Sequence, residues 1–228
     1  MTEKKQKSQC NLLKGEVLRL IVFSHFEVGN YYYHVIRKNK NVSFKLRWGA
    51  FVFGNIFPDI SKFAFVNHFY EDTISVYKCF QKKAGNPENT DMERSMALGV
   101  VCHFICDYFC KYHAKTPYTK QFMVIHMLYE ILLHFKMKSI LFKKTFGLLD
   151  LDEDCVFNTV TDQNGAAGSF DLLNMIREYE DQEESLLTDI VFSFGAVRGA
   201  VKEILRAETA AAEGVNNKER IPARRVIA

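Results

Sequence analysis

The chain has 228 residues, of which 48% are hydrophobic and 25% are charged, and its formal net charge is +3. This length suits one well-packed domain or at most two small ones, and the composition is typical of a soluble globular protein. Because the charge is small and the lysines are spread along the chain, the sequence lacks the basic stripe that favours nucleic-acid binding. No apolar run reaches the ~18 residues that a membrane-spanning helix requires.

The N-terminal segment and the cysteines both indicate a cytoplasmic protein. The basic start leads into an apolar run that Glu16 and Arg19 interrupt, and no small-residue cleavage site follows, so we expect no signal peptide. Cys102, Cys106 and Cys110 recur at every fourth position, which places them on one stripe of a helix. We interpret them as small buried residues in a reducing compartment, with thiolate binding of a metal as the alternative.

Helical periodicity dominates the chain, and strand signals are scarce. The expected helical segments, in chain order, are residues 12–23, 26–36, 63–80, 92–112, 121–146 and 171–206. Pro58 predicts a break in the chain directly before Asp59. Asn89, Thr90 and Asp91 stand in a loop where they can cap the helix that follows.

These elements predict an all-α fold. We expect a single multi-helix domain over residues 1–206. The last stretch shifts to alanine and charged residues with few large apolar side chains, so we expect a loosely ordered tail over residues 207–228.

Histidine and carboxylate residues recur in the middle of the chain in a pattern that indicates a metal site. The set consists of Asp59, His68, His103, Asp107, His113, His126 and Glu130, with His25 upstream. The pairs His103/Asp107 and His126/Glu130 are four residues apart, so on a helix both members of a pair lie on one face and can reach one ion. Imidazole nitrogen and carboxylate oxygen are ligands that suit borderline metals such as zinc.

The spacing of these residues resembles that of a known family. HFICDYFCKYH, residues 103–113, has the form H-x3-D-x5-H, and HMLYE, residues 126–130, has the form H-x3-E. GNIFPDI, residues 54–60, and the early histidine in FSHFEVG, residues 23–29, add two upstream elements. In these motifs the chain resembles the zinc-dependent phospholipase C family, which is related to the single-strand-specific zinc nucleases. The resemblance covers roughly residues 20–135 and implies the all-α fold of that family.

The resemblance also implies a set of ligands. One zinc ion would be held by His68, His103 and Asp107, and a second by His113, His126 and Glu130. A third ion would share the bridging Asp107 and take His25, while Asp59 would be either a ligand or the base that orients the attacking water. The family's third ion also uses an N-terminal tryptophan, and no tryptophan precedes His25 here, so two or three zinc ions are expected. His134, one turn after Glu130, is an alternative as a partner of a ligand.

The function that the resemblance implies is zinc-dependent hydrolysis of phosphate esters. We expect a phospholipase C-like phosphodiesterase, with phospholipid as a candidate substrate, in which a zinc-activated water attacks phosphorus in line. One alternative keeps the site and changes the substrate to nucleic acid or a nucleotide, which the weak positive charge does not favour. The other alternative is a metal-binding helical scaffold without catalysis. The sequence gives no indication of the oligomeric state.

Overall fold

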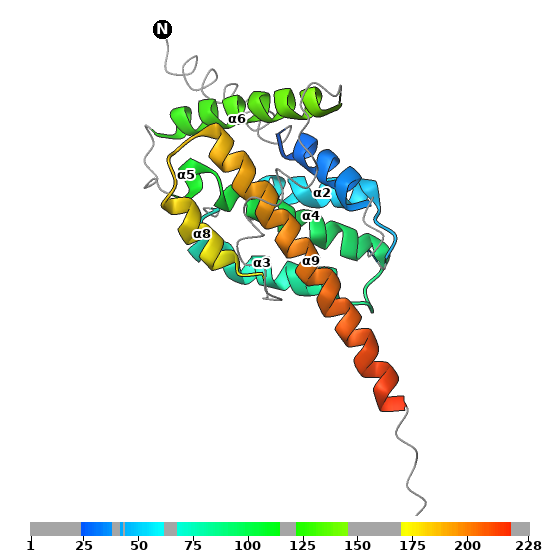
Figure 1. Ribbon diagram of the computed structural model, residues 1–228. Coiled ribbons are helices and arrows are strands. Elements are labelled where there is room, and N and C mark those ends of the chain that lie inside the picture. The colour runs from blue at the N-terminus through cyan, green and yellow to red at the C-terminus, as the bar shows by residue number, and fades with distance from the viewer. Residues whose placement is uncertain are drawn as a thin grey trace, which may run out of the picture.

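The computed structural model describes residues 24–37, 42, 44–61, 68–114, 122–145 and 170–219, and in this part of the chain every regular element is a helix (Figure 1). A helix over residues 24–37 comes first. The others are α2 (Trp48–Ile60), α3 (Tyr70–Gly85), α4 (Asp91–Tyr108), α5 (Lys111–Ala114), α6 (Phe122–Thr145), α8 (Leu172–Glu180) and α9 (Leu186–Glu219). The all-α prediction is therefore confirmed. Among the described helices, none combines the length and apolar character of a membrane span.

Helix α4 forms the centre of the fold. It begins with a capping box, in which the Thr90 hydroxyl accepts from the backbone N–H of Glu93 and the Glu93 carboxylate accepts from the N–H of Thr90. Most of its residues are buried, on every face of the helix, because α2, α3 and α9 pack around it. A helix that is apolar all round belongs in a protein interior, so polar side chains on α4 are held away from water by the fold.

Two glycines bring α2 and α4 into close contact. A Cβ atom on Gly99 would collide with the backbone carbonyl of Phe51, and one on Gly54 would collide with the carbonyl of Met96. Both clashes are with backbone atoms, which cannot rotate away. The crossing therefore depends on glycine at both positions, and it brings the backbone of Asn55 next to α4.

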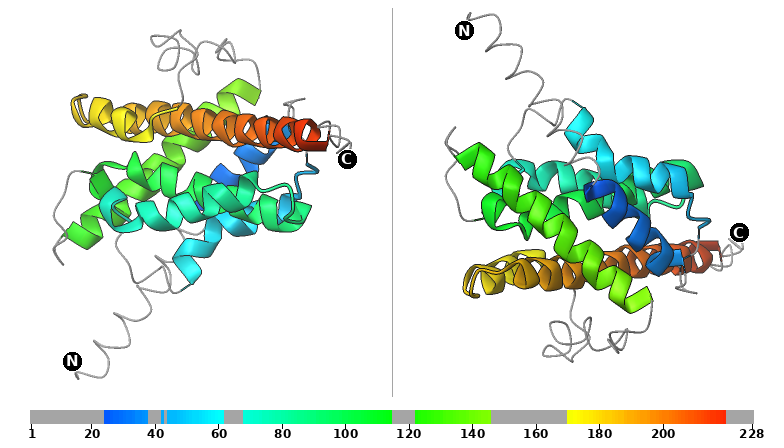
Figure 2. Two further views of the ribbon diagram at one scale, coloured as in Figure 1. Left: turned by 90° about the horizontal axis from the view of Figure 1, so that it is seen from below. Right: turned by 90° about the horizontal axis from the view of Figure 1, so that it is seen from above.

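Helix α9 covers one side of the bundle. Figure 2 shows it lying across α3 and α4 on one face, with α6 crossing nearby, and in Figure 1 its last turns project past the other helices. Its inner face is apolar and buried, with Ile190, Phe194, Val197, Val201 and Ile204 in the core. The Phe194 ring stacks on Tyr31 of the first helix at 5.2 Å between centroids. The hydrophobic core thus extends through residues from both ends of the described chain.

Several predicted boundaries are corrected by the structure. Pro58 lies inside the last turn of α2, so the predicted break before Asp59 is wrong, and the helix ends only at Ile60. Proline lacks the N–H that would bond to the carbonyl of Gly54, so α2 loses one backbone hydrogen bond there and ends two residues later. The predicted helix 92–112 is divided by a turn at Phe109 and Cys110 into α4 and α5. The helix expected to start at residue 63 begins at Tyr70 as α3.

The C-terminal half holds one further correction. The segment expected as a single helix over residues 171–206 is two helices, α8 and α9, separated by residues 181–185. Helix α9 continues past residue 206 to Glu219. The boundary between a domain and a tail at residue 206 stays a prediction, and residues 1–23 and 220–228 lie outside the described residues.

Candidate metal centre

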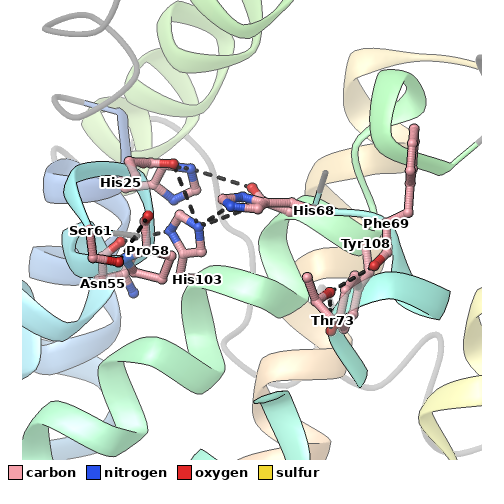
Figure 3. Close-up of polar contacts among 11 residues, drawn as sticks. His25, Asn55, Pro58, Ser61, His68, Phe69, Thr73, His103 and Tyr108 are labelled. Carbon is pink, nitrogen blue, oxygen red and sulfur yellow. Dashed lines mark hydrogen bonds and ion pairs between the residues drawn. The ribbon is translucent and has the colours of Figure 1, made fainter. Parts of the chain in front are cut away.

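The site is centred on the carboxylate of Asp107, in the last turn of α4. Its Oδ2 lies 2.7 Å from Nδ1 of His68 and 3.0 Å from Nε2 of His103. Its Oδ1 lies 3.4 Å from Nε2 of His25. Three imidazoles from three separate segments therefore meet at one carboxylate, and Figure 3 shows the rings of His25, His68 and His103 turned toward one another.

The ring of His103 is held in one orientation by α2. Its Nδ1 lies 2.9 Å from the backbone carbonyl of Asn55, a group that can only accept a hydrogen bond, so Nδ1 carries the proton. In the neutral ring the lone pair is then on Nε2, which faces Asp107. A histidine that donates one ring N–H to a carbonyl and presents its other nitrogen is arranged as metal ligands usually are. The close crossing at Gly99 makes this contact possible.

His68 precedes α3 and is fixed by the start of that helix. The Thr73 hydroxyl donates to the carbonyl of Phe69 at 2.7 Å, and the Tyr108 hydroxyl lies 3.0 Å from Thr73 Oγ1 (Figure 3). Tyr108 follows Asp107 directly in α4. The same turn of α4 therefore supplies the carboxylate and the hydroxyl that holds the His68 segment beside it.

Asp59 and His25 complete the cluster on its other side. Asp59 Oδ1 lies 3.7 Å from Nε2 of His103, and its Oδ2 lies 3.8 Å from Nε2 of His25. The rings of His25 and His103 are 4.1 Å apart between centroids. Ser61 donates to the carbonyl of Pro58 at 3.3 Å, which supports the end of α2 that carries Asp59. The position of Asp59, beside the cluster and not at its centre, suits either of its two predicted roles.

Burial and charge act against each other in this cluster. Burial alone would raise the pKa of Asp107, but the imidazoles of His103 and His25 outweigh it and hold this pKa well below its usual range. Burial lowers the pKa of His103, which is 0% exposed, and so favours the neutral imidazole that binds metals. For His25 burial also opposes the charged form, but the Asp59 and Asp107 carboxylates prevail and raise its pKa to about 9.

The donor atoms fit a metal ion. Among the described residues, two triads have ligand atoms within 4.8 Å of one another, namely His25, Asp59 and His103, and His68, His103 and Asp107. His103 Nε2 and Asp107 Oδ2 stand 3.0 Å apart, and when His103 is neutral both are acceptors that a bound cation would satisfy. Within the described residues, Asp59 Oδ2 and His25 Nδ1 are buried without a hydrogen bond. Nitrogen and oxygen donors of these types are those that zinc takes.

The ligands expected for a second ion are described only in part. His113 lies on α5 and His126 on α6, but their side chains are outside the described residues. Glu130 of α6 lines a pocket together with His25 and Asp107, so it faces the same cluster. His134 lines this pocket as well, and its role as a ligand's partner stays a prediction.

Three residues that position the site have no signal in the sequence motifs. Asn55 acts through its backbone carbonyl, which every residue type has, so no residue pattern could predict it. Thr73 and Tyr108 act through a hydroxyl pair across two helices, 35 residues apart in the sequence. Their contribution follows only from the packing of α3 against α4.

The fold and the site together form a helical bundle in which histidines converge on one buried aspartate and could hold a metal ion. The sequence matches the family described as zinc dependent phospholipase C over residues 24–182, well over half of the chain. The chain therefore belongs to the zinc-dependent phospholipase C family, as its motifs predict. No match was found among curated proteins or among solved structures. The family is one of zinc-dependent, phospholipase C-like hydrolases, and the histidine and aspartate clusters of this chain could hold the metal.

Proposed function

We propose that this protein is a zinc-dependent phosphodiesterase of the phospholipase C type, acting on phosphate esters that include phospholipids. The observation that carries the proposal is the Asp107 carboxylate, which presents one oxygen to His68 and His103 and the other to His25. A carboxylate can bridge two ions, whereas a neutral imidazole binds one, so Asp107 is the residue best placed to join adjacent metal positions. Family membership supports zinc as the metal.

The histidines and carboxylates of the cluster would act as the metal ligands. His68, His103 and Asp107 would hold one ion, and His113, His126 and Glu130 a second, with His25 available for a third beside Asp107. Bound zinc would supply the positive charge that offsets the phosphate and makes a water acidic enough to attack phosphorus in line. Asn55 keeps the lone pair of His103 directed into the cluster through the 2.9 Å contact with Nδ1.

Asp59 is the residue we assign to proton transfer. Its Oδ2 has no hydrogen bond within the described residues, and the carboxylate lies 3.7 Å from His103 at the edge of the cluster. From there it would accept a proton from the attacking water and orient that water toward phosphorus. Replacing it with asparagine should remove turnover while leaving the fold intact, because the amide keeps the volume of the carboxylate.

The test combines metal content with turnover. Elemental mass spectrometry of the purified protein should give two or three zinc ions per chain, and the protein should hydrolyse a chromogenic phosphodiester and phospholipid vesicles. Asp107→Asn should lose zinc and turnover together, while Asp72→Asn, which changes an exposed carboxylate on α3, should keep both.

Three results would contradict the proposal. Stoichiometric zinc without turnover on any phosphodiester would favour a metal-binding scaffold, and the absence of zinc after zinc is supplied would exclude the metal centre. Faster turnover on single-stranded DNA, with binding that weakens steeply as salt rises, would assign the site to a nuclease instead.

A further inference from the structure

A second buried carboxylate, Asp189, lies in the first turn of α9, outside the residues that match the family. It is 2% exposed and accepts three hydrogen bonds. Oδ2 accepts from the Tyr129 hydroxyl at 2.7 Å and from the backbone N–H of Lys111 at 3.2 Å, and Oδ1 accepts from the Tyr179 hydroxyl at 2.7 Å. A buried carboxylate is costly unless its oxygens are satisfied, so these contacts hold it in one place.

The three donors belong to three different elements. Lys111 is the first residue of α5, Tyr129 is on α6 and Tyr179 is near the end of α8. Asp189 therefore joins four helices at one point. The rings of Tyr112 and Tyr129 meet edge to face at 5.0 Å, which ties α5 to α6 directly beside the carboxylate. The Lys111 side chain also pairs with Glu184, just ahead of α9.

Two of these elements carry ligands that we assign to the second zinc ion. Helix α5 carries His113, two residues after Lys111, and Glu130 directly follows Tyr129 on α6. Helix α5 has only four residues and cannot be stable without outside contacts. Asp189 lines the same pocket as Glu130 and Asp107, so its carboxylate lies close to where these ligands would converge.

We propose that Asp189 is a positioning residue for the second zinc ion. Its carboxylate bonds to both α5 and α6 and so fixes the distance between the two helices that carry the ligands. This inference rests on the proposed function, because it assumes that His113, His126 and Glu130 bind zinc. Metal ligands have to be held within about 0.5 Å of their productive positions, and partners of the ligands commonly control metal affinity. Asp189 does this through the backbone of α5 and the Tyr129 hydroxyl, without touching the ion.

The two tyrosines provide a matched pair of variants. Tyr129→Phe and Tyr179→Phe each remove one hydroxyl that lies 2.7 Å from the same carboxylate. Tyr129 is on the ligand-bearing α6, whereas α8, which carries Tyr179, has none of the proposed ligands. Asp189→Asn keeps the side-chain volume and removes the charge. Zinc affinity is measured for each variant by competition with a chromogenic chelator, and thermal unfolding is measured on the metal-free proteins.

We expect Asp189→Asn and Tyr129→Phe to weaken one zinc site roughly 10- to 100-fold and to leave the affinity of the other site unchanged. Tyr179→Phe should lower the melting temperature of the metal-free protein without changing either zinc affinity. The proposal is overturned if both zinc affinities are unchanged in Asp189→Asn and Tyr129→Phe, or if Tyr179→Phe weakens zinc as much as Tyr129→Phe does. A wild-type protein that binds no zinc would instead refute the proposed function itself.

Discussion

Replacing Gly99 with alanine tests the close crossing of α2 and α4. The new Cβ would meet the Phe51 carbonyl and the Asn55 backbone nitrogen, neither of which can rotate away. Alanine gains about 1 kcal/mol over glycine in helix propensity. Forcing atoms into a packed interior costs about 3 kcal/mol at the upper end of the usual range, which is appropriate here because two backbones must separate. The net loss is about 2 kcal/mol, or a melting temperature lower by about 4–8 °C for a chain of this size.

The assay is thermal unfolding of the metal-free protein, followed by circular dichroism, with Gly49→Ala as the control. Gly49 lies in the first turn of α2, where an added Cβ has no neighbour within 4 Å, so alanine there should leave the melting temperature unchanged or raise it. The Gly99 variant should also bind zinc more weakly, because separating the helices moves the Asn55 carbonyl away from His103. If the two variants have equal melting temperatures, the glycine contact does not determine the helix crossing.

The remaining predictions concern the metal and the start of α4. Removing zinc with a chelator should lower the melting temperature of the wild-type protein, since an ion present at 100 times its dissociation constant adds about 2.7 kcal/mol. His103→Ala removes a ligand of one of the proposed ions and should therefore make this difference smaller. Thr90→Ala should cost about 1 kcal/mol of unfolding free energy through the lost cap. Hydrogen bonds from Thr90 lower the pKa of Glu93, so the stabilisation from this carboxylate is present above the usual pKa of glutamate and is lost as the pH falls. The difference between Thr90→Ala and wild type should therefore shrink in acid, and a difference that grows instead would contradict the assigned cap.

The sequence predicted the helical fold and part of the site for identifiable reasons. His103 and Asp107 are four residues apart on one helix, and their side chains lie 3.0 Å apart as that spacing requires. The approach of His68 and His25 to the same carboxylate was expected only from the family resemblance, because they come from other segments. Their roles as ligands stay predictions.

Other features could not be predicted from residue spacing. Asp189 is separated from Tyr129 by 60 residues and from Lys111 by 78, and no motif connects these positions. The end of α4 at Tyr108 was missed because the apolar pattern continues into the next turn, while the chain itself turns at Phe109 and Cys110. Periodicity describes which face of a helix is apolar, and it does not determine where the helix stops.

The position of α9 has a practical consequence for producing this protein. The family match ends at residue 182, so a gene fragment trimmed to those limits would omit the helix that covers α3 and α4. Such a fragment would expose Tyr32 and Phe109, whose rings now contact Phe194 and Phe192. Exposed apolar surface drives aggregation, so we expect the trimmed fragment to be insoluble. A longer fragment that ends at Ile204, the last described core residue of α9, should remain soluble. The recognisable family segment is thus shorter than the smallest piece that should fold.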